Sequence, residues 1–158
     1  MTLGDWFVRS AGKPIEFDGQ TVHMSHEWAV PEDAQGAEVA VVRASPRVRH
    51  GINLSARDMT LSINGHLMSK AIVWTDAAPS PFVVEFVPPR SPGALGDVAR
   101  RRIRVWNSWD DGSGVTHAWV GNAGILIDPQ PNKVVRLHCS DGGGEIDFES
   151  LVLDIKMF

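Results

Sequence analysis

The chain has little of what would place it in several protein classes. Its 158 residues include a single cysteine, Cys139, so no disulfide can form within the chain, and tyrosine is absent. No apolar run approaches the roughly 18 residues that a membrane-spanning helix needs. The amino terminus lacks the basic and then apolar segments of a secretory signal. These absences favour a reducing compartment, and we expect a cytoplasmic location.

Positive charge is also scarce. Lys and Arg number 15 against 19 Asp and Glu, which gives a formal net charge of -4. Nucleic-acid-binding domains usually carry a basic face, so we expect neither a nucleic-acid partner nor a membrane partner. One basic cluster, 100–104, begins a strand-like run. We interpret it as a solvated edge, and the alternative is a contact with an anion or a partner. The hydrophobic fraction of 43% is that of a globular chain, and we expect one domain over residues 1–158.

Apolar and polar residues alternate with a period of two along most of the sequence, as in half-buried strands. The run 59–63 alternates in this way and ends at Asn64-Gly65, a dipeptide that favours a two-residue hairpin turn. We expect the partner strand over 66–75, with Trp74 in the core. Further strands are expected over 21–28, 37–43, 82–87, 103–107, 115–120, 124–128, 134–139 and 151–157.

This pattern predicts an all-β fold. About nine or ten short strands, each bounded by Gly, Pro, Asn or Asp, are typical of an antiparallel β-sandwich, and we expect the jelly-roll type. Helices are expected only as short pieces, around 31–35 or 93–99. The segment 88–97, rich in Pro and Gly, is expected to be a surface loop of the same domain.

Three of the six tryptophans surround one polar loop. Trp106 and Trp119 flank a turn of Asp, Gly and Ser, and Trp109 stands near its start. Flat indole faces beside Asp, Asn and His side chains suit the apolar faces and hydroxyl groups of a sugar. The alternative is that Trp106 and Trp119 are cross-strand neighbours buried between two sheets. The expected ligand-binding residues are Trp106, Trp109, Asp110, Asp111, His117, Trp119 and Asn122.

A second polar loop is acidic and contains three consecutive glycines. If the segment after the glycines is extended, its three alternate carboxylates project to one face because the strand period is two. Ca²⁺ takes about six to eight oxygen ligands, so this loop is chemically suited to it. A plain solvated turn is the alternative. The expected metal ligands are Asp141, Glu145, Asp147 and Glu149.

Residues 147–152 read Asp-Phe-Glu-Ser-Leu-Val. With the glycines before them, they resemble the Asp/Gly-rich hairpin of some bacterial β-sandwich modules associated with calcium or carbohydrate. That hairpin ends in Asp-x-Asp-Phe/Tyr-Asn-Asp-Leu-Val, and here Glu149 and Ser150 stand where it has Asn-Asp. The resemblance implies a β-sandwich that binds calcium or a carbohydrate.

These observations favour a non-catalytic module that binds a small polar ligand, with carbohydrate as the expected class and Ca²⁺ as a structural cation. One alternative is an interaction or assembly subunit, because exposed Trp and Arg are enriched at interface centres. Another is a metal-dependent enzyme on a β-barrel. Its ligands would have to come from histidines that are distant in the sequence: His50, His66, His117 and His138.

Overall fold

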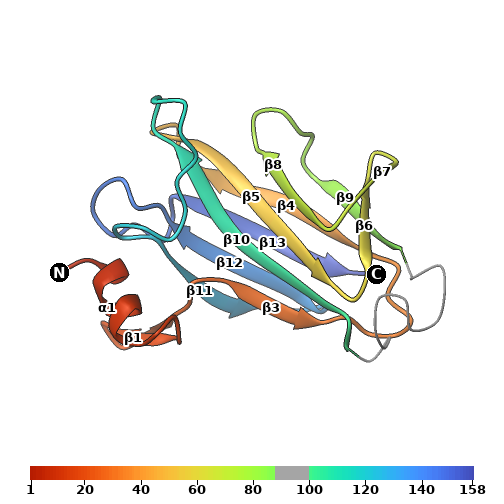
Figure 1. Cartoon of the computed structure of the whole chain (residues 1–158), viewed down its shortest axis with the longest axis horizontal. Helices are drawn as coiled ribbons and strands as arrows, with labels where there is room; N and C mark the ends of the chain where they lie inside the picture. Colours follow the sequence, from red (N-terminus) through yellow and green to blue (C-terminus); the bar gives the residue numbers. More distant parts are fainter. Residues whose placement is uncertain (88–99) are drawn as a thin grey trace.

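The computed structural model describes residues 1–87 and 100–158, and it consists mainly of antiparallel strands (Figure 1). The smaller main sheet contains, in order, β3 (His26–Ala29), β10 (Arg102–Asp110), β5 (Arg49–Arg57) and β8 (Lys70–Trp74). The larger sheet contains, in order, β11 (Gly124–Pro129), β12 (Val134–Ser140), β13 (Leu151–Met157), β4 (Gly36–Ala44), β9 (Phe82–Val87), β6 (Thr60–Ile63) and β7 (His66–Met68). The all-β class is therefore confirmed.

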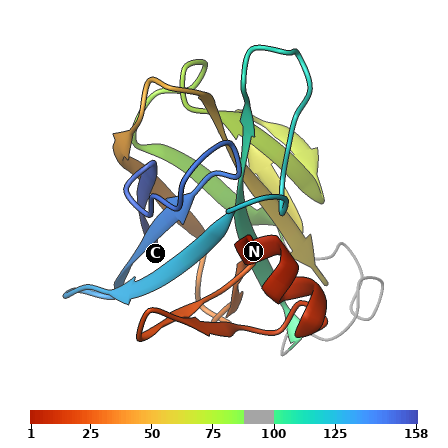
Figure 2. The same ribbon diagram turned by 90° about the vertical axis from the view of Figure 1, so that its left-hand side faces the viewer.

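The two sheets enclose one main hydrophobic core between them. The smaller sheet contributes alternate residues of its two central strands, such as Leu54 and Val105, each 1% exposed. Val39 and Leu137 of the larger sheet are fully buried against them. Each such side chain stabilises the fold by roughly 1.5–3 kcal/mol relative to an exposed one. Figure 2 shows the two layers from the end of the molecule where the chain begins.

A small helix and hairpin cover that end. α1 (Leu3–Arg9) begins at Thr2, whose side chain and backbone exchange hydrogen bonds with Asp5 in a capping box. Its buried residues Leu3 and Phe7 pack beside Val22, the last residue of the hairpin formed by β1 (Ile15–Phe17) and β2 (Gln20–Val22). No helix was predicted here, although Thr followed three residues later by an acid is a helix-start signal.

Several predicted strands occur at the expected positions. The ranges 82–87 and 151–157 coincide with β9 and β13. The hairpin turn is also confirmed: Ile63 pairs with His66, and Asn64 and Gly65 have φ of 51° and 79°. Positive φ at both turn residues is what a type I′ turn requires.

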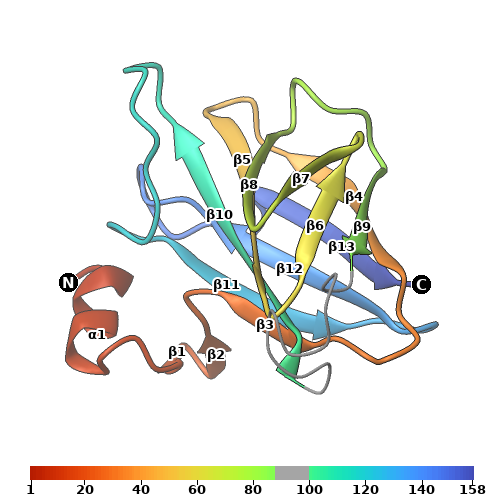
Figure 3. The same ribbon diagram turned by 45° about the vertical axis from the view of Figure 1, so that its right-hand side comes forward.

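Other expectations were wrong. The partner strand predicted over 66–75 ends at Met68, and the chain then crosses to the smaller sheet as β8 (Figure 3). Trp74 consequently lies half-buried outside the core. Residues 115–120 form no strand beyond a single bridge between His117 and Trp109. The range 21–28 divides between β2 and β3, and β5, at the centre of the smaller sheet, was not predicted.

The described residues contain thirteen strands, more than the nine or ten expected. The segment 31–35 is a turn, and the expectations for 88–97 and 93–99 lie outside the described residues. Arg101 of the basic cluster is 5% exposed and donates to the carbonyl of Pro31, so the cluster is not wholly a solvated edge. The jelly-roll connectivity stays a prediction. Across residues 1–87 and 100–158, no helix is long and apolar enough to cross a membrane.

Candidate functional site

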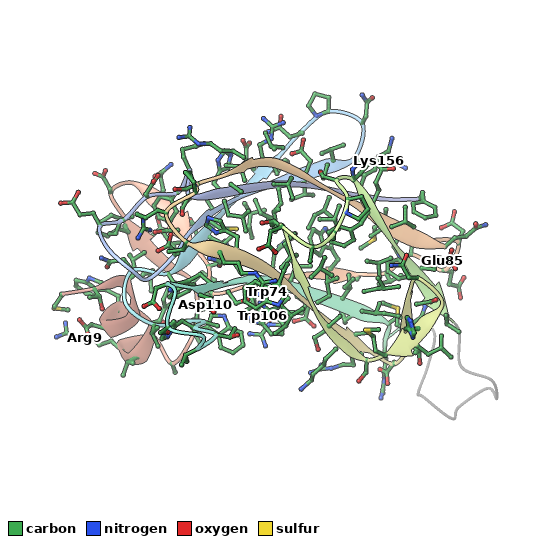
Figure 4. All side chains as sticks on the ribbon, turned by 90° about the horizontal axis from the view of Figure 1, so that it is seen from above. Arg9, Trp74, Glu85, Trp106, Asp110 and Lys156 are labelled. Atoms are coloured by element: carbon green, nitrogen blue, oxygen red, sulfur yellow. The ribbon has the colours of Figure 1, made fainter. Side chains whose placement is uncertain are left out.

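The outer surface of the smaller sheet carries a cluster of aromatic side chains. Trp106 alternates with the buried Val105, so its side chain leaves β10 on the outer side of the sheet, and its half-buried ring still contacts the main core. The strand register places Trp106 beside Asn53 and places Asn53 beside Ile72, which is 46% exposed. The same register places Trp74 beside Gly51, two residues along β5 from Asn53; Figure 4 labels Trp74 and Trp106, with Lys156 of the larger sheet above them. We call this surface the Trp face and define it as Asn53, Lys70, Ile72, Trp74, Arg104, Trp106 and Trp119.

Two tryptophans of the Trp face stack on each other. The ring centroids of Trp106 and Trp119 are 4.9 Å apart with an interplanar angle of 28°. The Nε1 of Trp119 donates to the carbonyl of Met24 at 3.0 Å. Trp119 has φ of 58°, a left-handed conformation that a bulky residue keeps only when its surroundings fix it. The stacking and the hydrogen bond supply that constraint, and Trp119 is still 37% exposed.

Arg104 adds a positive charge beside this aromatic pair. Its guanidinium carbon is 5.5 Å from the ring centroid of Trp106 and 5.3 Å from that of Trp119. Its Nε donates to the Ser25 hydroxyl at 2.6 Å. Arginine within about 6 Å of an indole centroid is attracted to the negative face of the ring. The cation and the two rings therefore form one positioned unit.

The Trp face is hollowed in two neighbouring places. A hollow of about 240 Å³ is lined by Asn53, Leu54, Lys70, Ala71, Ile72 and Trp106. A smaller hollow of about 110 Å³ is lined by Glu27, Ser55, Ala56, Arg57, Arg102 and Arg104. On β10, Trp106 lines the first hollow and Arg104 lines the second, and only Val105 lies between them. The floor of the first is fixed because the Asn53 amide donates to the Ser108 hydroxyl at 2.7 Å.

Trp109, predicted as an exposed aromatic, lies inside the molecule. It is 2% exposed, and a Cβ placed on Gly142 would lie 2.6 Å from its ring. Trp106 and Trp109 are three residues apart in one strand, so the period of two sends them to opposite faces. The alternative expectation, that Trp106 and Trp119 are buried between the sheets, was wrong too, because the pair stacks on the outside.

The predicted polar ligands on the loop after β10 make local contacts. The Asp110 carboxylate accepts hydrogen bonds from the backbone N–H groups of Gly112 and Gly114 at 2.8 and 3.1 Å. Asp111 lies 3.8 Å from the Nε2 of His117. The side-chain and backbone hydrogen bonds of Ser113 lower the pKa of Asp111. These contacts shape the turn itself.

Asn122 connects three separate segments. Its Oδ1 accepts from the backbone N–H of Leu3 at 3.2 Å, and its Nδ2 donates to the carbonyl of Gly144 at 2.8 Å. It therefore ties the helix end of the molecule to the acidic loop. Of the seven predicted ligand-binding residues, the structure brings Trp106 and Trp119 together on the Trp face.

Asp141, a predicted calcium ligand, is part of an ion pair. Its side chain is 1% exposed, and Arg47 Nη2 donates to its two oxygens at 2.6 and 2.5 Å. The Ser150 hydroxyl donates at 2.5 Å and the backbone N–H of Gly143 at 3.0 Å. Burial raises the pKa of Asp141, but the hydrogen bonds from Ser150 and Arg47 outweigh it, so the net pKa is below the usual value.

The other three predicted calcium ligands do not join Asp141. They lie in or between a bend and a turn rather than in a strand, where the exposed Glu145, Asp147 and Glu149 alternate with the half-buried Ile146 and Phe148. Asp147 accepts from the backbone N–H of Glu149 at 2.9 Å, Glu149 lies 3.1 Å from His138 Nδ1, and Glu145 is exposed. Within the described residues, no three His, Cys, Asp or Glu side chains are grouped to hold a metal ion.

The four histidines of the enzyme alternative are likewise scattered. His50 is buried with its Nε2 2.9 Å from the Ser45 carbonyl oxygen, and burial lowers its pKa. His138 lies on the larger sheet with Asp128 at Nε2 and Glu149 at Nδ1, on opposite edges of its ring. Because the two carboxylates lie on opposite edges of the imidazole ring, they cannot both bind a metal ion that one ring nitrogen coordinates. The convergence that this alternative needs is absent from the described chain.

A larger cavity of about 530 Å³ lies away from the Trp face. Its thirteen lining residues include Trp28 and Phe158, and three of them, Asp33, Gln130 and Lys133, carry a charge or an amide. Mainly hydrocarbon walls suit an apolar molecule better than a polar one. We therefore place the candidate site for a polar ligand on the Trp face.

Sequence reasoning missed most of the Trp face. Asn53 lies on the unpredicted strand β5, and Lys70, Ile72 and Trp74 lie on β8, which was assigned to a different pairing. The period of two that puts Lys70, Ile72 and Trp74 on one face of a strand was the signal in the sequence that could have grouped them. Comparisons of the chain with protein-family models, with curated proteins and with solved structures find no match.

Proposed function

We propose that this chain is a non-catalytic carbohydrate-binding module and that the Trp face is its binding surface. The observation that carries the proposal is the stacked, partly exposed pair of Trp106 and Trp119 on a sheet surface that also presents Asn53, Lys70 and Arg104. A sugar ring has apolar C–H faces and hydroxyl groups around its edge. An indole covers the faces, and polar side chains bond the hydroxyls.

Rigidity supports the same proposal. The Trp119 indole is held by its hydrogen bond to Met24, and the residues of β10 and β8 are held by the sheet. Side chains fixed before binding lose less conformational entropy when a ligand arrives, so more of the contact energy appears as affinity. The proposal includes no structural cation, because Asp141 already has Arg47 and Ser150 as partners.

Electrophoresis in native gels that contain dissolved polysaccharide tests this proposal. The gels would contain xylan, glucomannan or polygalacturonate, and a bound protein migrates more slowly. We expect retardation by at least one polymer and expect Trp106→Ala to weaken it at least about tenfold, the loss of about 1.4 kcal/mol of contact. Trp6→Ala is the matched control, because Trp6 lies on α1 and is 42% exposed.

Two results would contradict the proposal. One is unchanged mobility of the wild-type protein in every polymer. The other is equal retardation of wild type and Trp106→Ala, which would place the sugar site elsewhere. Circular dichroism melts of both variants show whether each is folded, so a loss of binding is not mistaken for a loss of structure.

An interaction surface is the second candidate function. Ile72 and Trp119 are 46% and 37% exposed on the same face, and contiguous exposed apolar groups with Trp and Arg are typical of interface centres. Sedimentation equilibrium would detect self-association. A dimer that Ile72→Glu and Trp106→Ala both dissociate would favour this function, whereas a monomer at all concentrations would not.

A further inference from the structure

We propose that the glycan recognised by the Trp face is acidic, with a carboxylate or sulfate group that lies against the arginines next to the aromatic pair. This inference rests on the proposed function and adds the chemical class of the ligand. It starts from cations that three neighbouring strands bring to one part of the sheet. They are Arg57 of β5, Lys70 of β8, and Arg102 and Arg104 of β10.

The register shows that these cations share one surface. Arg102 pairs with Arg57, and Ser55 pairs with both Arg104 and Lys70. Arg102 and Arg104 alternate with the buried Ile103, so both point outward. One carboxylate, that of Glu27, accompanies the four cations in this region, opposite Arg104 on β3. A chain with a net charge of -4 therefore has a local excess of positive charge here.

These cations are not paired with carboxylates of the described chain. Elsewhere, Arg47 and Arg136 form ion pairs with Asp141 and Asp154 at 2.5 and 2.8 Å. At the far end of the Trp face, Arg49 lies over the Trp74 ring and pairs with Asp76 at 2.8 Å. None of the four cations of this region has a described carboxylate within 4.0 Å.

The contacts of these arginines occupy only part of each guanidinium. Arg104 uses Nε toward Ser25, and Arg102 uses one Nη toward the carbonyl of Arg101. A guanidinium has five N–H donors, so each arginine keeps donors that match the two oxygens of a carboxylate or sulfate. An anionic ligand would therefore meet unused donors rather than compete with an existing ion pair.

The spacing of rings and cations fits one sugar residue. Trp106 and Arg104 are two residues apart on β10, which places their attachment points about 7 Å apart. A uronic acid carries its carboxylate at the edge of the pyranose ring, one bond from the ring atoms. A ring stacked on the indole at Trp106 would direct that group toward Arg104 and the hollow lined by Arg57 and Arg102.

Single-stranded nucleic acid also combines stacking bases with negative charge. Its binding depends on contacts with many phosphates along the strand. The cations here occupy one part of a single sheet face. A saccharide with one anionic group per ring or per few rings fits this arrangement better, and a homopolymeric DNA serves as a comparison in the test.

The experiment is isothermal titration calorimetry with a galacturonate trisaccharide and with its methyl ester, which has the same rings but no charge. We expect the acid to bind at least about tenfold more tightly than the ester, corresponding to about 1.4 kcal/mol. We expect 500 mM NaCl to remove most of this difference because salt screens exposed charges. A sulfated trisaccharide and a short poly(dT) complete the set of probes.

Variants separate charge recognition from stacking. Arg57→Gln combined with Arg102→Gln should weaken binding of the acid several-fold and leave binding of the ester unchanged. Arg43→Gln is the matched control, because Arg43 is an exposed arginine on β4 of the other sheet. Tighter binding of the sulfated sugar than of the galacturonate would identify sulfate as the anionic group and would still support an acidic glycan.

Four outcomes would overturn the inference. If acid and ester bind equally, or if neutral polymers alone retard the protein in gels, the proposed function stands and the ligand is a neutral glycan. If poly(dT) binds more tightly than any saccharide, the Trp face serves a nucleic acid instead. If no glycan binds in either experiment, the proposed function fails as well.

Discussion

At the scale of single residues, Asp141 has the chemistry of a metal ligand but forms an ion pair. Arg47 donates to both of its oxygens and also to the carbonyl of Gly143 at 2.6 Å, so one side chain holds the whole turn. Three donors, from Arg47, Ser150 and Gly143, surround a nearly fully buried carboxylate. The sequence lists these residues far apart, and nothing in the spacing of 47 and 141 predicts their contact.

Arg47→Met tests this ion pair. Losing a charged donor to a buried carboxylate is expected to lower the free energy of unfolding by roughly 1.5–3 kcal/mol at pH 7. Arg43→Met is the control and should change it by less than about 0.5 kcal/mol. Urea melts measure both. Because the folded pKa of Asp141 is lowered, its stabilising effect is present above the ordinary pKa and disappears as the pH falls through the folded pKa, so the variants should converge there.

The burial of His26 leads us to expect a second dependence of stability on pH. Burial, and secondarily the charge of His23, lowers its pKa from 6.5 to about 4. Between these two values the unfolded chain binds a proton that the folded chain does not, so the free energy of unfolding falls as the pH decreases from 6.5 to 4. Urea melts across this range should show a smaller decrease for His26→Gln. His66→Gln, on the exposed hairpin, should keep the wild-type slope; equal slopes for all three proteins would contradict the prediction.

Trp109 and Trp106 should respond in opposite ways to truncation. Trp109→Ala removes a buried indole and is expected to cost roughly 3–5 kcal/mol of stability. Glycan affinity, measured on the folded protein at low temperature, should be unchanged, because Trp109 and Trp106 lie on opposite faces of the sheet. A stable Trp109→Ala variant with weakened binding would mean that the burial assigned to Trp109 is wrong.

At the scale of elements, we expect the acidic loop to give no change in thermal stability when calcium is added. Asp141 is engaged by Arg47, and within the described residues no three His, Cys, Asp or Glu side chains are grouped to hold a metal ion. A cation that binds only the folded state raises stability with the ratio of its free concentration to its dissociation constant. We expect thermal midpoints in EDTA and in millimolar CaCl₂ to agree within about 1 °C. A rise of several degrees would show a site that the loop geometry does not suggest.

Strands were predictable where one face is apolar and the other polar. β13 has Leu151, Leu153 and Ile155 inward, and its bounds follow from this alternation. β5 was missed although its sequence carries the same signal: Ile52, Leu54 and Ala56 alternate with the polar Asn53, Ser55 and Arg57. A Cβ on Gly51 would lie 2.6 Å from the Ser108 hydroxyl oxygen, so glycine allows that side chain to approach the strand closely.

The candidate site was partly predictable for the same physical reason. The proximity of Trp106 and Trp119 follows from a loop that returns on itself, and the strand period was enough to separate Trp106 from Trp109. The contributions of Trp74 and Lys70 depend on the crossing of the chain between sheets after Met68. Such a crossing depends on long-range packing, which local alternation does not report.

At the scale of the whole molecule, the two outer faces differ in charge chemistry. The outer face of the larger sheet carries polar side chains in mutual contact, such as the ion pair of Arg136 with Asp154 and the contact of His138 with Glu149. On the smaller sheet Arg49 lies over the ring of Trp74 and is paired with Asp76. The same sheet also presents four cations without a described carboxylate partner: Arg57, Lys70, Arg102 and Arg104. A ligand that brings both a ring and a negative charge complements the second face and gains little from the first.

The most direct measurement follows the indole N–H signals of the six tryptophans by ¹H–¹⁵N NMR during titration with the galacturonate trisaccharide. We predict shifts for Trp74, Trp106 and Trp119, with the signals of Trp6, Trp28 and Trp109 unchanged. Trp28 lines the larger cavity, so its signal reports a ligand bound there. Shifts confined to Trp28 or Trp6, or no shifts at saturating saccharide, would contradict the assignment of the Trp face as the ligand-binding surface.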